Sequence, residues 1–147
     1  MKLVISSDHG GFELKKYIID YIRQTRKIEV DDLGCYTDAS VDYPEFGYLV
    51  AKKVAAGAAD FGIIICGSGI GISIAANKIK GARAALCHCE EYARLARLHN
   101  DANILALGGR FLTTEQATKI VDTFLDTKFE GGRHQRRVDA LNLYGQE

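Results

Sequence analysis

The sequence lacks a net charge, a long apolar run and, with one exception, proline. Its 147 residues include 19 basic and 19 acidic side chains, so we expect no overall attraction to nucleic acid or to an anionic membrane. No apolar stretch approaches bilayer length, and the start MKLVISSDHGG becomes polar too early for a signal peptide. With a single proline and no low-complexity tract, residues 1–147 are expected to form one ordered domain in the cytoplasm.

Cysteine is scarce as well, with four residues at Cys35, Cys66, Cys87 and Cys89. In a cytoplasmic protein these are expected to be reduced thiols rather than disulfides. The sequence CHC at 87–89 has the composition of a metal cluster, but it lacks a second ligand pair at the usual zinc spacing. We therefore expect no structural metal there.

Short β-branched segments alternate with stretches of helical periodicity along the chain. Helices are indicated by apolar residues three and four apart, such as Leu14, Tyr17 and Ile18. Strands are expected near residues 2–6, 28–32, 61–66, 83–87 and 102–107. Five strand–helix units predict an α/β fold with a five-stranded parallel sheet covered on both faces, followed by an extra helix from Arg133 to Tyr144.

Polar residues gather where two of these strands end. Parallel sheets bind ligands at the carboxyl ends of strands, beside the point where the strand order reverses. The segment Asp8–Gly11 follows the first strand, and Cys66–Gly71 follows the third. In a flavodoxin-like strand order these two loops are neighbours, so we expect them to share one site.

The stretch IIICGSGIGIS at 63–73 carries glycines in the pattern G-x-G-x-G. A dinucleotide-binding loop needs G-x-G-x-x-G, a P-loop needs a following Lys-Ser or Lys-Thr, and a cysteine phosphatase loop needs arginine where Ile72 stands. What remains is a helix start whose amides suit an oxyanion and favour the thiolate form of Cys66. From spacing alone, a small buried structural cysteine explains Cys66 equally well.

The chain resembles the ribose-5-phosphate isomerase B family, which also includes galactose-6-phosphate isomerase subunits. The resemblance covers essentially the whole chain, in five motifs that occur in order: SSDHGGFELK, DYP, CGSGIGISIAANK, RLHNDANILALGGR and FEGGRHQRRV. It implies a Rossmann-like three-layer α/β/α sandwich that interconverts aldose and ketose phosphates without a metal or other cofactor. It also implies a homodimer or a dimer of dimers.

The same resemblance implies roles for individual residues. Cys66 matches the base that moves a proton between C1 and C2, and His99 matches the acid/base that opens the sugar ring. Ser68, also implied in catalysis, stands where many members have threonine. Some members replace the cysteine base by a glutamate further along the loop. The implied substrate-binding residues are Asp8, His9, Tyr43, Gly67, Ser68, Gly69, Ile70, Gly71, Asn100, Arg110, Arg133 and Arg137.

Several of these residues have a simpler structural explanation. Asp8 is a suitable N-cap for the helix that starts near residue 11, and His99 with Asn100 suits a helix C-terminus. The arginines near residue 135 suit a solvated basic face. Arg133 and Arg137 are nevertheless four apart, so they share a helix face on which both can contact one phosphate.

The topology separates the expected acid from the expected base. The helix that carries His99 runs away from the end of the sheet where Cys66 lies, so His99 is expected at the opposite end. The last strand–helix unit returns the chain to that opposite end before Arg133. One subunit is therefore not expected to bring these groups together. We predict a composite site in which Cys66 and Asp8 of one chain meet His99, Arg133 and Arg137 of its partner.

The sequence leaves alternatives to a pentose phosphate isomerase. The same chemistry could act on galactose or allose 6-phosphate, with the chain serving alone or as one subunit. Two further alternatives are a non-catalytic sugar-phosphate-binding module and a flavodoxin-like FMN carrier. A base, an acid and a phosphate clamp in one chain favour a self-sufficient ribose-5-phosphate isomerase, in which His88 and His134 are expected to be structural.

Overall fold

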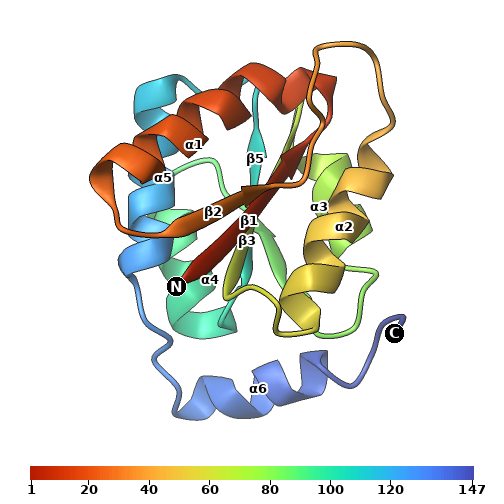
Figure 1. Ribbon diagram of the computed structural model, residues 1–147. Coiled ribbons are helices and arrows are strands. Elements are labelled where there is room, and N and C mark those ends of the chain that lie inside the picture. Colours follow the sequence, from red (N-terminus) through yellow and green to blue (C-terminus); the bar gives the residue numbers. More distant parts are fainter.

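The computed structural model describes all 147 residues as a five-stranded sheet between two layers of helices (Figure 1). Every pair of neighbouring strands is parallel, as predicted. The strands are β1 (Lys2–Ser7), β2 (Glu29–Asp32), β3 (Phe61–Cys66), β4 (Ala84–Leu86) and β5 (Ile104–Gly108).

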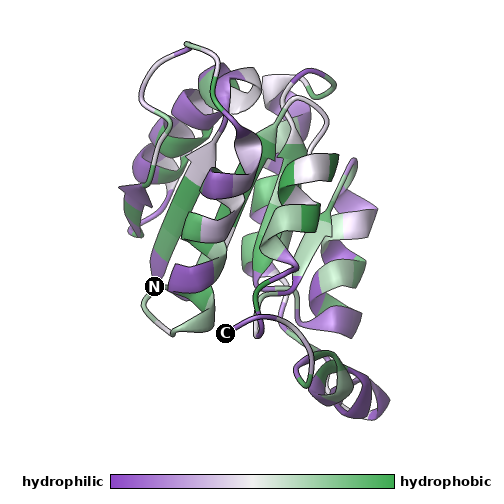
Figure 2. Ribbon diagram, turned by 90° about the vertical axis from the view of Figure 1, so that its right-hand side faces the viewer, coloured by the Kyte–Doolittle hydropathy of each residue, from purple (hydrophilic) through white to green (hydrophobic).

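The helices cover both faces of this sheet, and one lies outside the two layers. Helices α2 and α3 pack on one face, whereas α1, α4 and α5 pack on the other. Helix α6 lies beyond the amino-terminal ends of the strands in both views (Figures 1 and 2). The bounds are η1 (His9–Gly11, a 3-10 turn), α1 (Phe12–Thr25), α2 (Tyr43–Ala55), α3 (Ile70–Ala76), α4 (Glu90–Asn100), α5 (Thr114–Asp126) and α6 (Arg133–Leu141).

The strand order is β2-β1-β3-β5-β4. Its first half is that of a flavodoxin-like sheet, so β1 and β3 are neighbours, as predicted. The last two strands are exchanged relative to the flavodoxin order, and this part of the prediction was wrong. Burial explains the exchange, because β5 is buried along its whole length whereas the three residues of β4 are half-buried, as suits an edge.

Strand β3 separates two hydrophobic cores. Ile63 and Ile65 pack with α1, α4 and α5, whereas Ile64 and Cys66 pack with α2 and α3. Successive side chains of a strand point to opposite faces, so a strand covered on both sides is apolar throughout. Burial of each isoleucine stabilises the fold by about 1.5–3 kcal/mol. Figure 2 shows this pattern as apolar strands inside helices with polar outer surfaces.

A buried lysine fixes the loop after β2. The Lys15 side chain is fully buried; its Nζ lies 2.6 Å from Asp32 Oδ1 and donates to the Cys35 carbonyl oxygen, also at 2.6 Å. The backbone of the same loop pairs with Ser7 at the end of β1. These contacts hold the loop beside the 3-10 turn, where the Val41 amide donates to His9 Nδ1 at 3.2 Å.

Local capping agrees with the sequence. Thr113 and Gln116 form a capping box at the start of α5, a pairing that the Thr-x-x-Gln sequence favours, and Pro44 lies in the first turn of α2. Helix α3 ends at Ala76, and α6 ends at Leu141, earlier than the expected Tyr144. The longest helix, α1, has 14 residues, and none of the helices combines the length and apolarity that crossing a bilayer requires.

Candidate active site

The carboxyl ends of β1, β3 and β5 border an open cavity of about 550 Å³. The loops after β1 and β3 share this cavity, as predicted from their positions in the sheet. Its lining residues are Asp8, Tyr43, Cys66, Gly67, Ser68, Ile70, Gly71, Arg110 and Phe111. All but Phe111 are residues to which the family resemblance assigned a role in catalysis or substrate binding.

Cys66 ends β3 with only 4% of its surface exposed. The Gly69 amide donates to its Sγ across 3.1 Å. An amide donor of this kind stabilises negative charge on sulfur, which is what a proton acceptor at this position needs. Gly69 adopts φ of +78°, a conformation that glycine reaches without strain, at the point where the loop turns into α3.

Ser68 and Arg110 complete the wall beside the sulfur. Ser68 Oγ accepts a hydrogen bond from the Ile70 amide, so its own proton is left for another acceptor. The amides of Gly109 and Arg110 donate to the carbonyls of Cys66 and Gly67 at 2.8 and 3.0 Å. This pairing places the Arg110 guanidinium against Gly67, where it adds positive charge to the cavity.

Tyr43 reaches the cavity because residue 71 is glycine. A Cβ on Gly71 would lie 2.5 Å from the Tyr43 ring, so any larger residue would displace the tyrosine. Tyr43 is 40% exposed, and its ring therefore covers one side of the glycine loop while remaining accessible from the cavity.

Asp8 and His9 hold structural positions at the rim. Asp8 Oδ1 accepts from the amides of Gly10 and Gly11 and so caps the 3-10 turn η1. The predicted N-cap role is thus found one element earlier, because α1 begins after Gly11 without a side-chain cap. Asp8 also lines the cavity, so its carboxylate both caps the turn and is accessible to a bound substrate. His9 is not among the lining residues. Its Nδ1 accepts from Val41, which leaves Nε2 as the donor of that ring.

His99 lies near the amino-terminal ends of the strands, at the opposite end of the sheet from Cys66, as predicted. It occupies the last turn of α4, and its imidazole stacks on that of His134 with ring centroids 4.3 Å apart. Glu130 Oε2 lies 3.9 Å from His99 Nε2 and 4.0 Å from His134 Nε2. Burial lowers the pKa of His134, and the neighbouring His99 adds to this effect.

The predicted phosphate ligands Arg133 and Arg137 lie on α6 and are exposed. Figure 1 places this helix beyond the amino-terminal ends of the strands, away from Cys66. Between them in the sequence, His134 is buried, so the two arginines turn outward while the histidine turns toward α4. Within one chain the base and these arginines are therefore separate.

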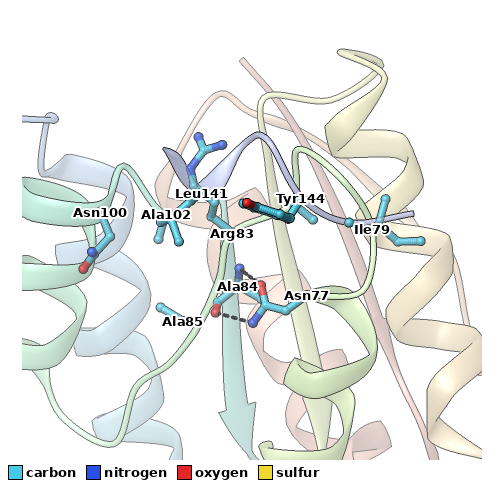
Figure 3. A pocket seen from close by; sticks show the side chains of 11 residues that line it. Asn77, Ile79, Arg83, Ala84, Ala85, Asn100, Ala102, Leu141 and Tyr144 are labelled. Carbon is cyan, nitrogen blue, oxygen red and sulfur yellow. Dashed lines mark hydrogen bonds between the residues drawn. The ribbon is translucent and has the colours of Figure 1, made fainter. Parts of the chain in front are cut away.

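Asn100 lines a different cavity, of about 470 Å³, between α4, β4 and the C-terminal segment (Figure 3). Tyr144 and Leu141 close it from α6 and the residues beyond. The Asn77 amide hydrogen-bonds both backbone groups of Ala84 there, and so occupies the open edge of β4. Asn100 is thus remote from Cys66 in its own chain.

The CHC sequence forms no paired thiolate site. Cys87 is buried, and burial raises the pKa of its thiol to about 12, with the neighbouring Cys89 adding to the shift. It is therefore protonated at neutral pH. Cys89 is exposed at the N-cap of α4.

The sequence model of the family described as Ribose/Galactose Isomerase matches residues 3–141. The chain belongs to the ribose/galactose isomerase family. It is 50% identical to a probable ribose-5-phosphate isomerase B of Mycoplasma genitalium over 99% of this chain and 96% of that protein. It is 46% identical to ribose-5-phosphate isomerase B of Escherichia coli, with 99% and 97% of the two chains covered.

Solved structures of this family share the fold. Ribose-5-phosphate isomerase B of Clostridium thermocellum superposes with a TM-score of 0.95 at 52% identity, covering 97% of this chain and 96% of that one. The Mycoplasma genitalium structure with bound ribulose-5-phosphate has a TM-score of 0.92 at 49% identity, covering 97% and 94%. The three-layer sandwich implied by the sequence is therefore the fold of this chain.

Sequence reasoning missed three residues at the two sites. Phe111 lines the Cys66 cavity and is 73% exposed. Glu130 and His134 contact His99, although His134 was expected to be only structural. Glu130 and His134 belong to the FEGGRHQRRV motif, but helical periodicity does not predict that this motif contacts α4. A backbone hydrogen bond from the Glu130 amide to the Leu98 carbonyl joins the two segments.

Proposed function

We propose that the chain is an aldose–ketose isomerase that interconverts ribose 5-phosphate and ribulose 5-phosphate through an enediolate. The observation that carries the proposal is the Cys66 sulfur, which faces a sugar-sized cavity and accepts the amide of Gly69. Membership of the ribose/galactose isomerase family supports the reaction class. The ribulose-5-phosphate bound to the Mycoplasma genitalium relative supports a pentose substrate.

Cys66 acts as the base in this mechanism. Its thiolate removes the C2 proton of the open-chain aldose, and the electron pair moves to form an enediolate with negative charge on oxygen. A proton then passes from O2 to O1 of the enediolate, and the Cys66 thiol protonates C1, which yields the ketose and restores the thiolate. Remaining amides at the start of α3, the Ser68 hydroxyl and the Arg110 guanidinium stabilise the developing oxyanion.

A partner chain supplies the acid and the phosphate clamp. His99 lies at the end of the sheet opposite Cys66. Its side chain is 38% exposed, so it is available to a neighbouring subunit. Arg133 and Arg137 are likewise exposed on α6 and share one helix face. Two guanidinium groups anchor a phosphate and position the reacting carbons over the thiolate.

Exposed apolar side chains around the Cys66 cavity support self-association. Ile70 and Phe111, which line the cavity, are 53% and 73% exposed, and Ile74, one turn along α3 from Ile70, is 57% exposed. Apolar groups clustered at a site rim are typical of a surface that another chain covers. A homodimer, alone or paired into a dimer of dimers, buries them and brings the two halves of the site together.

Substrate choice is tested by steady-state kinetics with ribose 5-phosphate, allose 6-phosphate and galactose 6-phosphate. We expect kcat/KM for ribose 5-phosphate to exceed that for either hexose by about tenfold or more, the discrimination that one extra carbon centre allows. A preference for a hexose phosphate would reassign the substrate. Binding of ribose 5-phosphate without turnover would identify a non-catalytic module and overturn the proposal.

A further inference from the structure

Three potential metal ligands meet at the end of the sheet opposite Cys66. His99, Glu130 and His134 each contribute one ligand atom, and these atoms lie within 4.8 Å of one another. They come from α4, from the segment before α6 and from α6 itself. The Glu130 amide donates to Leu98 at 3.1 Å and the His134 amide donates to Gly131 at 3.1 Å, so backbone contacts hold the cluster together.

His134 Nε2 points into this cluster without a partner. The residue is only 7% exposed, and Nε2 is a buried side-chain polar atom that has no hydrogen-bond partner. Leaving a buried polar atom unpaired in this way is unfavourable, because its hydrogen bonds to water are lost and not replaced. A cation bound between the three side chains would satisfy it.

The open geometry needs a modest closure to hold an ion. Glu130 Oε2 lies 3.9 and 4.0 Å from the two imidazole Nε2 atoms, whereas ligand atoms about 2.0–2.1 Å from a tetrahedral zinc lie roughly 3.3 Å apart. The imidazole planes are inclined by only 15°, so one ring must also turn before both can face the same ion. Glu130 is exposed and His99 is half-buried, so both can close on the buried His134.

We propose that His99, Glu130 and His134 form an inhibitory site for a divalent d-block cation such as Zn²⁺. Two imidazoles and one carboxylate match the ligand set of zinc sites that keep a fourth position open. Magnesium and calcium are disfavoured because they prefer oxygen ligands, and the positive Arg133 and Arg137 nearby weaken any site that relies on charge alone. Inhibition follows because the ion occupies Nε2 of His99, and this consequence alone rests on the proposed function.

Cobalt(II) absorption tests the site directly, using the intact protein with Cys89→Ser to remove the exposed thiol. We expect one Co²⁺ per chain with visible bands of tetrahedral N/O coordination and no thiolate charge-transfer band. Glu130→Gln, which keeps the shape of the side chain, is expected to weaken binding by about tenfold or more. His134→Ala should abolish the bands, whereas the matched control His88→Ala, at an exposed histidine, should leave them unchanged.

Equal cobalt binding by all variants, a thiolate band, or no binding would overturn the proposed site. Inhibition is measured separately, as Zn²⁺ titration of ribose 5-phosphate turnover with reversal by a chelator. Zinc should inhibit the Cys89→Ser protein at lower concentration than the Glu130→Gln protein. Cobalt binding that leaves turnover unaffected would confirm the metal site and contradict the catalytic role of His99, so the two claims fail independently.

Discussion

Replacement of Cys66 by alanine is expected to reduce turnover of ribose 5-phosphate by about 10²–10⁴-fold, the usual contribution of a positioned general base. The sulfur is the group at the end of β3 that faces the cavity and accepts the Gly69 amide. Alanine removes the proton acceptor while retaining a small apolar side chain on the α2/α3 face of the sheet. Stopped-time assays in both directions measure the loss.

The Cys66→Ala substitution should impair the proton-transfer step and leave substrate binding intact. Binding of ribulose 5-phosphate, followed by calorimetry, is expected to persist because the arginines and the glycine loop remain. Cys89→Ser is the matched control, since Cys89 is exposed at the N-cap of α4 and lies outside the cavity, and it should retain full activity. A Cys66→Ala protein with wild-type turnover would make the thiol structural.

Replacement of His99 by asparagine is expected to affect the two directions of the reaction unequally. Ribose 5-phosphate is largely a closed ring, whereas ribulose 5-phosphate cannot form a furanose because its 5-oxygen carries the phosphate. Loss of the ring-opening acid should therefore reduce turnover from ribose 5-phosphate by about 10²-fold or more and spare turnover from ribulose 5-phosphate. Initial rates from each substrate give the comparison.

His88→Asn is the control for this variant, because His88 is exposed and remote from the stacked pair of His99 and His134. It should leave both rates unchanged. Equal losses in both directions for His99→Asn would show that His99 acts on the isomerisation itself or on binding, rather than on the ring.

Most of the fold could be predicted because its signals are local. Periodicity located the strands and helices, and a continuous apolar run identified β3 as a strand covered on both faces. The exchange of β4 and β5 was missed because strand order depends on which segment is long and apolar enough for the centre. The three residues of β4, preceded by the charged Arg83, indicate an edge in retrospect.

The candidate site was predictable in part for a similar reason. Position after a strand located Asp8 and Cys66, and spacing placed Arg133 and Arg137 on one helix face. Contacts between segments that are distant in the sequence produce no comparable spacing or periodicity in the sequence. The packing of Tyr43 on Gly71 and the contact of Glu130 with His99 depend on how loops cross the sheet edges.

The composite site is tested most directly by subunit complementation. Cys66→Ala and His99→Ala chains are each expected to turn over ribose 5-phosphate at least about 10²-fold more slowly than the wild type. With that substrate, a mixed assembly contains sites that combine the intact Cys66 of one chain with the intact His99 of the other. Random co-assembly of equal amounts should restore about a quarter of wild-type activity in a symmetric oligomer, because one site in four receives both groups. Activity no higher than that of the separate variants, in assemblies shown to contain both chains, would contradict the composite site.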